Sequence, residues 1–265
     1  MASIPARMRM WFSYLVIFGL LAGVTFLPAD TSLAEVRRAG LLRACMPPLY
    51  PPLVTADPAA PGIDVELLRA IAKDLGLTFE IAPNPAMGQD FNPRNWHVTR
   101  AQCEVLAGGV VGSPVTRSFL ETSPSYAETG WAFVSGKPLG DISGLRAGVF
   151  TGVSGLDRLA LSRYLRAHNV ELTVVPSAAE LANGLRAGRF DFGVTEKLAA
   201  GEIAAREGLI AAWAPAELPR FPLVLGLWKG DLTLKRAIVD ALERLERSGE
   251  VARIVGRYAG GKPTS

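Results

Sequence analysis

The stretch Gly62-Ile-Asp-Val-Glu-Leu-Leu-Arg-Ala-Ile-Ala-Lys-Asp-Leu-Gly76 decides the fold of this 265-residue chain. Its apolar residues recur at helical spacing, which predicts one amphipathic helix over residues 64–75. The apolar stripe consists of Val65, Leu68, Ala72 and Leu75. Asp64 is expected to cap this helix, because its carboxylate can accept the free N–H groups of the first turn. Gly76 is expected to end it in the left-handed conformation. By itself the pattern predicts a scaffold helix packed on a sheet.

Strands and helices are expected to alternate along most of the chain. Strands are predicted at residues 40–44, 77–81, 104–111, 145–150, 171–175 and 190–194. Helices are predicted at 64–75, near 98–102, at 156–167 and at 178–187. An extended segment at 221–229 and two apolar-striped helices, 234–245 and 251–258, follow. This order is typical of an α/β fold whose parallel strands are joined by crossover helices.

The N-terminus has the features of a secretory signal peptide. Arg7 and Arg9 precede an apolar run from Trp11 to Leu27, and Ser32-Leu33-Ala34 offers a small-x-small cleavage site. We therefore expect cleavage after Ala34 and a periplasmic protein with no membrane span. The alternative is a single transmembrane anchor, since the apolar run is at the lower limit for crossing a bilayer.

Composition argues against several classes of function. The net charge is +3, and no basic run is interleaved with aromatic residues, so nucleic-acid binding is not expected. The chain has two cysteines and two histidines and no CxxC motif, so neither a metal site nor another cofactor is predicted. No phosphate loop or nucleophile elbow is present, and we do not expect an enzyme. In an oxidising compartment, Cys45 and Cys103 could form a disulfide or remain as two separate buried thiols.

Short motifs around the quoted helix follow one another in a characteristic order. They are Leu42-Arg43-Ala44, Tyr50-Pro51-Pro52, Ala107-Gly108-Gly109, Ser123-Pro124-Ser125-Tyr126, residues 145–150, residues 187–191 and Lys229-Gly230-Asp231. Together with the helix, this set resembles the periplasmic solute-binding proteins of family 3, the polar amino-acid binders of ABC transporters. The resemblance implies a type II periplasmic-binding-protein fold. Each of its two α/β lobes has a mixed, mainly parallel sheet, two crossover strands form the hinge, and the ligand lies between the lobes.

The resemblance also implies where the lobes begin and end. We expect a signal peptide at 1–34, lobe 1 at 35–130 and 222–260, lobe 2 at 131–221 and a flexible tail at 261–265. In such a lobe the third strand lies beside the first, which would bring Cys45 and Cys103 close enough for a disulfide.

The family's carboxylate-binding arginine lies seven residues after the glycine that ends the third strand. Counting from Gly109, this position is Thr116, and Arg117 is one residue further along. A shifted loop would let Arg117 form the bidentate pair with a carboxylate, and the alternative is that Arg117 is a surface arginine. Ser113 keeps a hydroxyl that the family uses in its cleft.

Two aromatic positions of the family would contact the ligand. One corresponds to Phe91, for which plain packing between loops is the alternative. The other lies in the first loop, where Tyr50 or Leu53 would serve. Aromatic faces in a cleft bury apolar ligand surface or hold a cation.

The second lobe supplies the remaining candidates. Glu196 is in register with the acid that binds the ligand ammonium group, and a surface ion pair with Lys197 is the alternative. Thr151 and Ser154 belong to a turn before a helix, whose N–H groups suit an anion.

Three functions remain open. The first is a monomeric receptor that binds a small polar solute and delivers it to the permease of an ABC importer. The second is an accessory protein of a quinoprotein methanol dehydrogenase, because Arg43-Ala44-Cys45 and Cys103-Glu104 resemble motifs of such accessory proteins. The third is an enzyme similar to cyclohexadienyl dehydratase, with Glu196 as general acid.

Overall fold

The computed structural model describes residues 11, 14–19, 30–88, 92–151 and 156–258. The chain divides into two compact units, Met1–Thr31 and Ser32–Ser265. In the first unit, the described residues are helical and exposed from Tyr14 to Gly19. Among the described residues, none of the helices is both long enough and apolar enough to cross a bilayer.

Five strands form the first sheet, in the order β2-β1-β3-β12-β4. Strand β1 runs parallel to β2 and β3, whereas β12 runs antiparallel to β3 and β4. The strands are β1 (Leu41–Met46), β2 (Thr78–Pro83), β3 (Val105–Leu106), β4 (Glu121–Thr122) and β12 (Gly226–Leu227). Strand β12 comes from a distant part of the sequence and inserts between β3 and β4, so two separate segments of the chain build this lobe.

The helices of the first lobe come from both of these segments. They are α2 (Ser32–Ala39), α3 (Ile63–Asp74), α4 (Pro114–Phe119), α8 (Leu232–Arg247) and α9 (Glu250–Tyr258), with 3-10 turns at Pro85–Gly88 and Pro93–Trp96. Helix α3 contacts β1, β2, α8 and α9. Three residues of the predicted stripe of α3, Val65, Leu68 and Ala72, are buried in the core. The fourth, Leu75, directly follows the helix and is half-buried against the same core.

A second sheet has the order β10-β6-β9-β7-β8. Its β7, β8 and β9 are parallel, and β6 and β10 run antiparallel to their neighbours. The strands are β6 (Trp131–Ser135), β7 (Arg146–Val149), β8 (Glu171–Val174), β9 (Phe192–Glu196) and β10 (Ile210–Trp213). The helices are α5 (Arg158–Ala167), α6 (Ala178–Arg186) and α7 (Lys197–Glu207).

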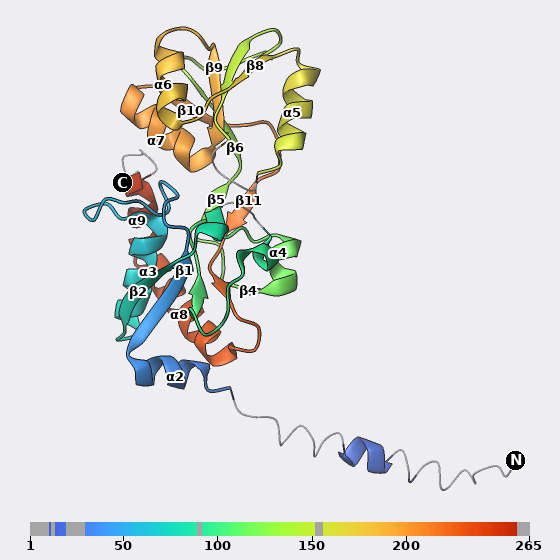
Figure 1. Ribbon diagram of the computed structural model, residues 1–265, viewed down its shortest axis with the longest axis vertical. Helices are drawn as coiled ribbons and strands as arrows, with labels where there is room; N and C mark the ends of the chain where they lie inside the picture. Colours follow the sequence, from blue (N-terminus) through green and yellow to red (C-terminus); the bar gives the residue numbers. More distant parts are fainter. Residues whose placement is uncertain (1–10, 12–13, 20–29, 89–91, 152–155, 259–265) are drawn as a thin grey trace, which may run out of the picture. The chain divides into compact units, whose positions relative to one another are not determined.

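Two short antiparallel strands, β5 (Ala127–Thr129) and β11 (Phe221–Leu223), connect the sheets. The chain enters the second sheet through β5 and returns through β11, and Figure 1 shows this pair at the junction of the lobes. The predicted two-lobed α/β fold is confirmed. The exact lobe boundaries at 130–131 and 221–222 stay a prediction, and the predicted tail at 261–265 lies outside the described residues.

Several predicted elements differ in the structure. The helix expected near residues 98–102 is a turn, in which Gln102 N–H donates to the Thr99 carbonyl. The third strand is shorter than expected, because Gly108 and Gly109 leave the extended conformation with φ of 85° and 94°. Helices α2, α4 and α7 and strands β4, β5, β6 and β10 were not predicted.

The two ends of α3 differ in how well the sequence predicts them. Gly76 has a φ of 71°, and its N–H donates to the Lys73 carbonyl, so the predicted helix end is confirmed. The predicted cap is wrong. Helix α3 begins at Ile63 with Gly62 at the N-cap position, and no side chain caps it. Asp64 therefore lies inside the first turn, where its carboxylate is available to other partners.

Asp64 joins three segments of the first lobe. One carboxylate oxygen accepts the N–H groups of Gly108 at 2.5 Å and Gly109 at 3.1 Å, and the other accepts the hydroxyl of Tyr126 at 2.6 Å. The side chain is fully buried. Burial disfavours the charged form more than these donors favour it, and it raises the pKa of Asp64 to about 6.

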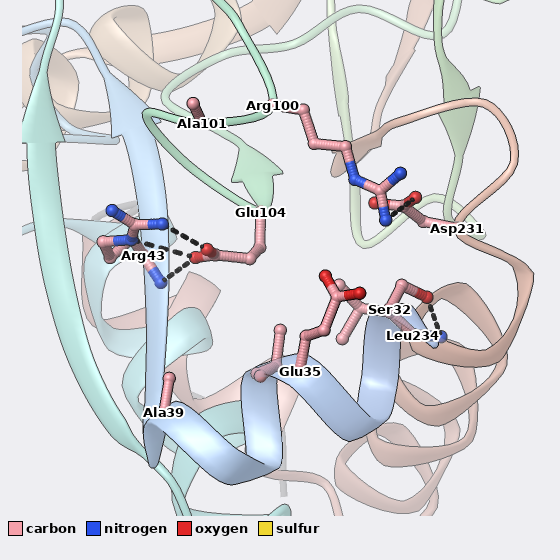
Figure 2. Close-up of a pocket in the computed structure, with 10 residues that line it drawn as sticks. Ser32, Glu35, Ala39, Arg43, Arg100, Ala101, Glu104, Asp231 and Leu234 are labelled. Carbon is pink, nitrogen blue, oxygen red and sulfur yellow. Dashed lines mark hydrogen bonds and ion pairs between the residues drawn. The ribbon is translucent and has the colours of Figure 1, made fainter. Parts of the chain in front are cut away.

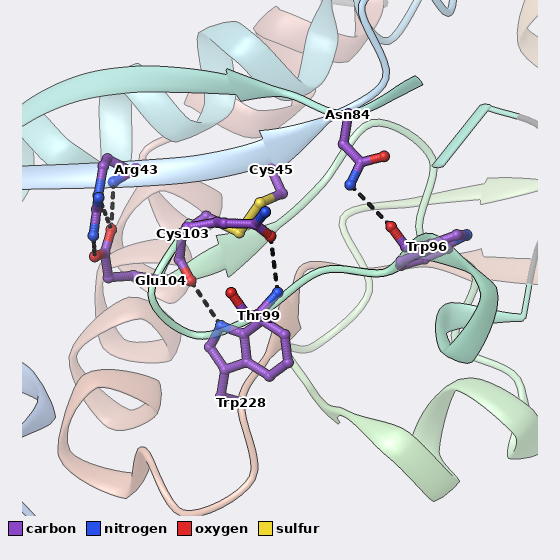
Figure 3. The surroundings of a disulfide bond; sticks show 9 residues. Arg43, Cys45, Asn84, Trp96, Thr99, Cys103, Glu104 and Trp228 are labelled. Carbon is purple, nitrogen blue, oxygen red and sulfur yellow. Dashed lines mark hydrogen bonds and ion pairs between the residues drawn. A yellow bond between two sulfur atoms is a disulfide. The ribbon is translucent and has the colours of Figure 1, made fainter. Parts of the chain in front are cut away.

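The predicted disulfide is confirmed. Cys45 and Cys103 are bonded, with their Cα atoms 5.6 Å apart, so the alternative of two buried thiols is wrong. The bond fixes the end of β1 to the segment that leads into β3 (Figure 3). Beside it, Arg43 pairs with Glu104 at 2.6 Å, and the indole N–H of Trp228 donates to the Cys103 carbonyl at 2.7 Å.

Removal of the disulfide tests how much this connection stabilises the lobe. The bond closes a loop of 58 residues, and loop-closure entropy gives a stabilisation of about 4 kcal/mol. We expect the double variant Cys45→Ser/Cys103→Ser to lose about this much in urea denaturation. A reductant should lower the wild-type midpoint toward that of the variant and leave the variant unchanged. An unchanged wild-type midpoint after complete reduction would contradict this prediction.

The pKa of Asp64 predicts a pH-dependent stability. Because the pKa is raised from 3.8 to about 6 in the folded protein, folding favours the protonated form. The stabilisation is complete below the unfolded pKa and is lost as the pH rises through about 6. The unfolding free energy of the wild type minus that of Asp64→Asn should fall by about 2 kcal/mol from about pH 4 to about pH 7. A difference that stays constant over this range would show that Asp64 has an ordinary pKa.

Candidate functional site

Glu196 ends β9 and is the N-cap residue of α7. One carboxylate oxygen accepts the N–H groups of Leu198 at 2.9 Å and Ala199 at 3.0 Å. The other accepts the hydroxyl of Thr129 at 2.5 Å. Thr129 is the last residue of β5, so this carboxylate fixes the second lobe to a crossover strand. Such a cap forms here because an acid directly before a helix can accept the unpaired N–H groups of its first turn.

The environment of Glu196 differs from that of a surface acid. Only 4% of the residue is exposed, and burial raises the pKa of its carboxyl group despite the hydrogen bonds from Thr129 and the helix. The ion pair with Lys197 that was the alternative is not formed within the described part of the chain. Instead the Lys197 ammonium lies 5.5 Å from the centre of the Trp213 ring.

Tyr50 lies close to both buried acids. Its ring packs directly over Gly109, where an added Cβ atom would be 2.7 Å from the ring. Burial raises the pKa of the Tyr50 phenol, and the charges of Glu196 and Asp64 raise it further. The structure therefore brings the first-lobe aromatic and the second-lobe acid within electrostatic reach. Leu53, the other candidate in this loop, is buried in the core.

Ser113 and Thr116 form the N-terminus of α4. The Ser113 hydroxyl accepts the Thr116 N–H at 3.1 Å, and the two hydroxyl groups are 3.1 Å apart. Thr116 is only 1% exposed, whereas Ser113 is half-buried. The residue at the family's arginine position is therefore part of a helix cap, and Ser113 is the more accessible of the pair.

Arg117 lies on the exposed side of α4, close to the crossover strands. Its guanidinium is 3.4 Å from the point where a Cβ atom on Gly112 would lie. Gly112 in turn donates its N–H to the carbonyl of Pro222 in β11 at 2.8 Å. The cleft role of Arg117 stays a prediction.

The other predicted residues contribute less. Phe91 and Ser154 lie outside the described residues. The carbonyl of Thr151 accepts a hydrogen bond from Arg158 at 2.8 Å. Among the residues that the structure describes, no group of three or more histidine, cysteine, aspartate or glutamate side chains is placed to hold a metal ion.

Sequence reasoning missed Thr129 and Tyr126 as partners of the two buried acids. Tyr126 lies 62 residues from Asp64, and Thr129 lies 67 residues from Glu196. Neither residue shows its partner through spacing. The one hint in the sequence was that Tyr126, just before β5, and Thr129, at its end, both carry hydroxyl groups that can donate to a buried acid.

Solved structures of solute-binding proteins share this fold. An ancestral cationic amino acid solute-binding protein has a TM-score of 0.70 and 19% identity, over 86% of this chain and 99% of its own. The L-cystine solute receptor of Neisseria gonorrhoeae has a TM-score of 0.68 and 18% identity, over 89% of this chain and 100% of its own. A mutant arginine-binding protein of T. maritima has a TM-score of 0.59 and 19% identity, over 86% and 98%. No curated protein sequence matches the chain.

Substitution of Gly109 tests the position of Tyr50. In Gly109→Ala the new methyl group would meet the Tyr50 ring, and we expect a loss of about 1–3 kcal/mol beyond the cost of the backbone conformation. Gly76→Ala is the matched control, because Gly76 also has a positive φ and the described residues leave open space around its Cβ position. Urea denaturation of both variants gives the difference. Equal losses would show that Tyr50 does not pack on Gly109.

The comparisons agree with the order of motifs, the two sheets and the paired crossover strands. The sequence pattern of the bacterial extracellular solute-binding proteins, family 3, matches residues 42–261. The match spans both lobes, and the chain therefore belongs to this family of solute-binding proteins.

Proposed function

We propose that this protein is exported to the periplasm, acts there as a monomer, and captures a small polar solute between its lobes for an ABC importer. The observation that carries the proposal is that Glu196, which accepts the Thr129 hydroxyl at the end of a crossover strand, acts electrostatically on Tyr50 of the first lobe. A solute held at this place would contact both lobes and favour their closure. Relatives named for cationic amino acids and for L-cystine support an amino-acid-like solute, and an organic-acid-like solute is the other candidate.

The hydrogen bonds that Glu196 already accepts limit how many it can accept from a solute. An ionised carboxylate has about four acceptor positions, and three donors already use most of them. We therefore assign Glu196 at most one bond to an ammonium group, and we assign the main anchor to Arg117, through an anionic group of the solute. Tyr50 and Phe91 supply aromatic surface, and Ser113, Thr116, Thr151 and Ser154 complete the proposed site.

A second candidate is the dehydrogenase accessory protein. The confirmed Cys45–Cys103 bond, next to Glu104, is the observation that favours it, because the resemblance to such accessories includes these residues. This role would require a quinoprotein dehydrogenase as partner in place of a permease.

An enzymatic role has less support. One structural neighbour is described as a precursor of cyclohexadienyl dehydratase, and burial raises the pKa of Glu196, as a general acid requires. However, the carboxylate caps α7 and accepts from Thr129, so transfer of a proton would disturb contacts that hold the lobe. We therefore propose a binding protein that is not an enzyme.

A thermal-shift titration separates these roles. Probes are L-arginine, L-glutamine, L-cystine, succinate, putrescine and prephenate. A solute at 100 times its Kd should stabilise the receptor by about 2.7 kcal/mol, in a saturable manner. Absence of stabilisation by every probe, together with co-purification of a dehydrogenase, would favour the accessory role. Turnover of prephenate would establish the enzymatic role instead.

The role of Arg117 can be tested with the solute that binds best. Arg117→Ala should weaken binding by about 10- to 100-fold, because a charge-assisted hydrogen-bond pair is lost. Arg236→Ala is the matched control, since Arg236 is an exposed arginine on α8. Binding that is the same in both variants would place Arg117 outside the site.

A further inference from the structure

Two cations of the second lobe lie against the same indole ring. The Arg220 guanidinium carbon is 4.4 Å from the centre of the Trp213 ring, and the Lys197 ammonium is 5.5 Å from it. A cation at such a distance over an indole is attracted by the negative face of the ring. Trp213 and Lys197 are half-buried, whereas Arg220 is exposed. The ring therefore holds two positive charges close together.

These residues lie where the chain crosses between the lobes. Strand β6 begins at one edge of the second sheet, and it pairs there with Glu196 at the end of β9 and with Trp213 at the end of β10 (Figure 1). Lys197 directly follows Glu196, and Arg220 directly precedes β11. Because the crossover strands reach the second lobe at this edge, the two positive charges lie at the junction of the lobes.

Gly130 connects this cluster to the first crossover. Its carbonyl accepts the Lys197 N–H at 2.9 Å. A Cβ atom on Gly130 would lie 3.1 Å from the Trp213 ring and 3.4 Å from the Arg220 Cα atom. The ring is thus packed between the segment that joins β5 to β6 and the start of the second crossover. The backbone of both crossovers therefore fixes where the ring lies, and with it the two cations.

The two cations differ from the other clustered charges of the protein. Figure 2 shows a cavity of about 430 Å³ in the first lobe, where two arginines are neutralised by acids in the pairs Arg43–Glu104 and Arg100–Asp231. By contrast, neither Lys197 nor Arg220 forms a salt bridge with a residue that the structure describes. Like charges at short range repel each other, so an anion in contact with both would be attracted to them.

The neighbouring acid leaves little room for a positive group here. The Glu196 carboxylate already accepts three hydrogen bonds, which use most of its acceptor positions. Burial raises the pKa of Glu196, and the charge of Lys197 acts in the opposite direction, so the two side chains interact electrostatically. A positive end of a solute would gain at most one bond at this edge of the sheet, whereas a negative end would gain two cations.

We infer that Lys197 and Arg220 form a second-lobe anchor for an anionic group, and that the solute is a dicarboxylate with its other carboxylate on Arg117. The inference rests on the proposed function and deepens it, because it names the class of solute. Charge-assisted hydrogen bonds from an ammonium or a guanidinium group to a carboxylate are about twice as strong as neutral ones. A solute held by cations of both lobes favours their closure.

Isothermal titration calorimetry of the exported protein with matched solutes tests the anchor. Succinate and glutarate are compared with succinamate and glutaramate, in which an uncharged amide of similar size replaces one carboxylate. We expect the wild type to bind the dicarboxylate about 10- to 100-fold more tightly than its monoamide, because the amide cannot form the charge-assisted contacts. Lys197→Met and Arg220→Gln should each remove most of this preference, and Lys197→Arg should keep it.

Lys137→Met is the matched control. Lys137 is exposed and follows β6 at the opposite edge of the same sheet, so this variant should keep both affinities and the preference. A purely structural role of Lys197 would weaken the dicarboxylate and the monoamide equally. That result, or equal binding of the two solutes by the wild type, would overturn the inference.

The wider set of probes separates this inference from the proposed function. Binding of L-arginine or putrescine, with no binding of either dicarboxylate, would overturn the dicarboxylate anchor and leave the receptor role in place. Failure of every solute in the thermal-shift titration to bind would overturn the proposed receptor and the anchor with it.

Discussion

The buried carboxylate of Asp64 is the contact on which the first lobe depends. Its three donors come from the glycines after β3 and from Tyr126 just before β5. It therefore holds helix α3, the end of the central strand and the start of the crossover in one arrangement. Gly109, fixed in this way, forms the surface on which Tyr50 packs. A change at Asp64 would be transmitted to the proposed site through these neighbours and not through any direct contact with a solute.

Glu196 has the corresponding role in the second lobe. Its carboxylate caps α7 and accepts the hydroxyl of Thr129 at the end of β5. Both lobes are thus tied to the same crossover strand by a buried acid, one at each end of the strand. The pKa of each acid is raised by burial, so each is held at an energetic cost. We propose that this cost is offset by the particular arrangement that the two acids fix at the junction of the lobes.

The sequence predicted the parts of the fold that depend on local patterns. The stripe of α3 and its end at Gly76 follow from residues within one helix, and both are confirmed. The true partners of Asp64 lie 44 to 62 residues away, so its local environment suggested a cap that does not exist. Glu196 was found through its family position, but the hydrogen bond that it accepts from Thr129 joins residues 67 positions apart and has no local signal in the sequence. Helix α2 was missed because its first residues were assigned to the leader.

A solute bound at the crossover strands is expected to close the two lobes about them. Small-angle X-ray scattering of the protein, with and without a saturating amount of the solute that stabilises it best, tests this claim directly. We expect a smaller radius of gyration in the presence of the solute, because closure brings the two sheets together. An unchanged radius of gyration at full saturation would show that the solute binds without closure of the lobes, which would contradict the proposed mechanism of capture.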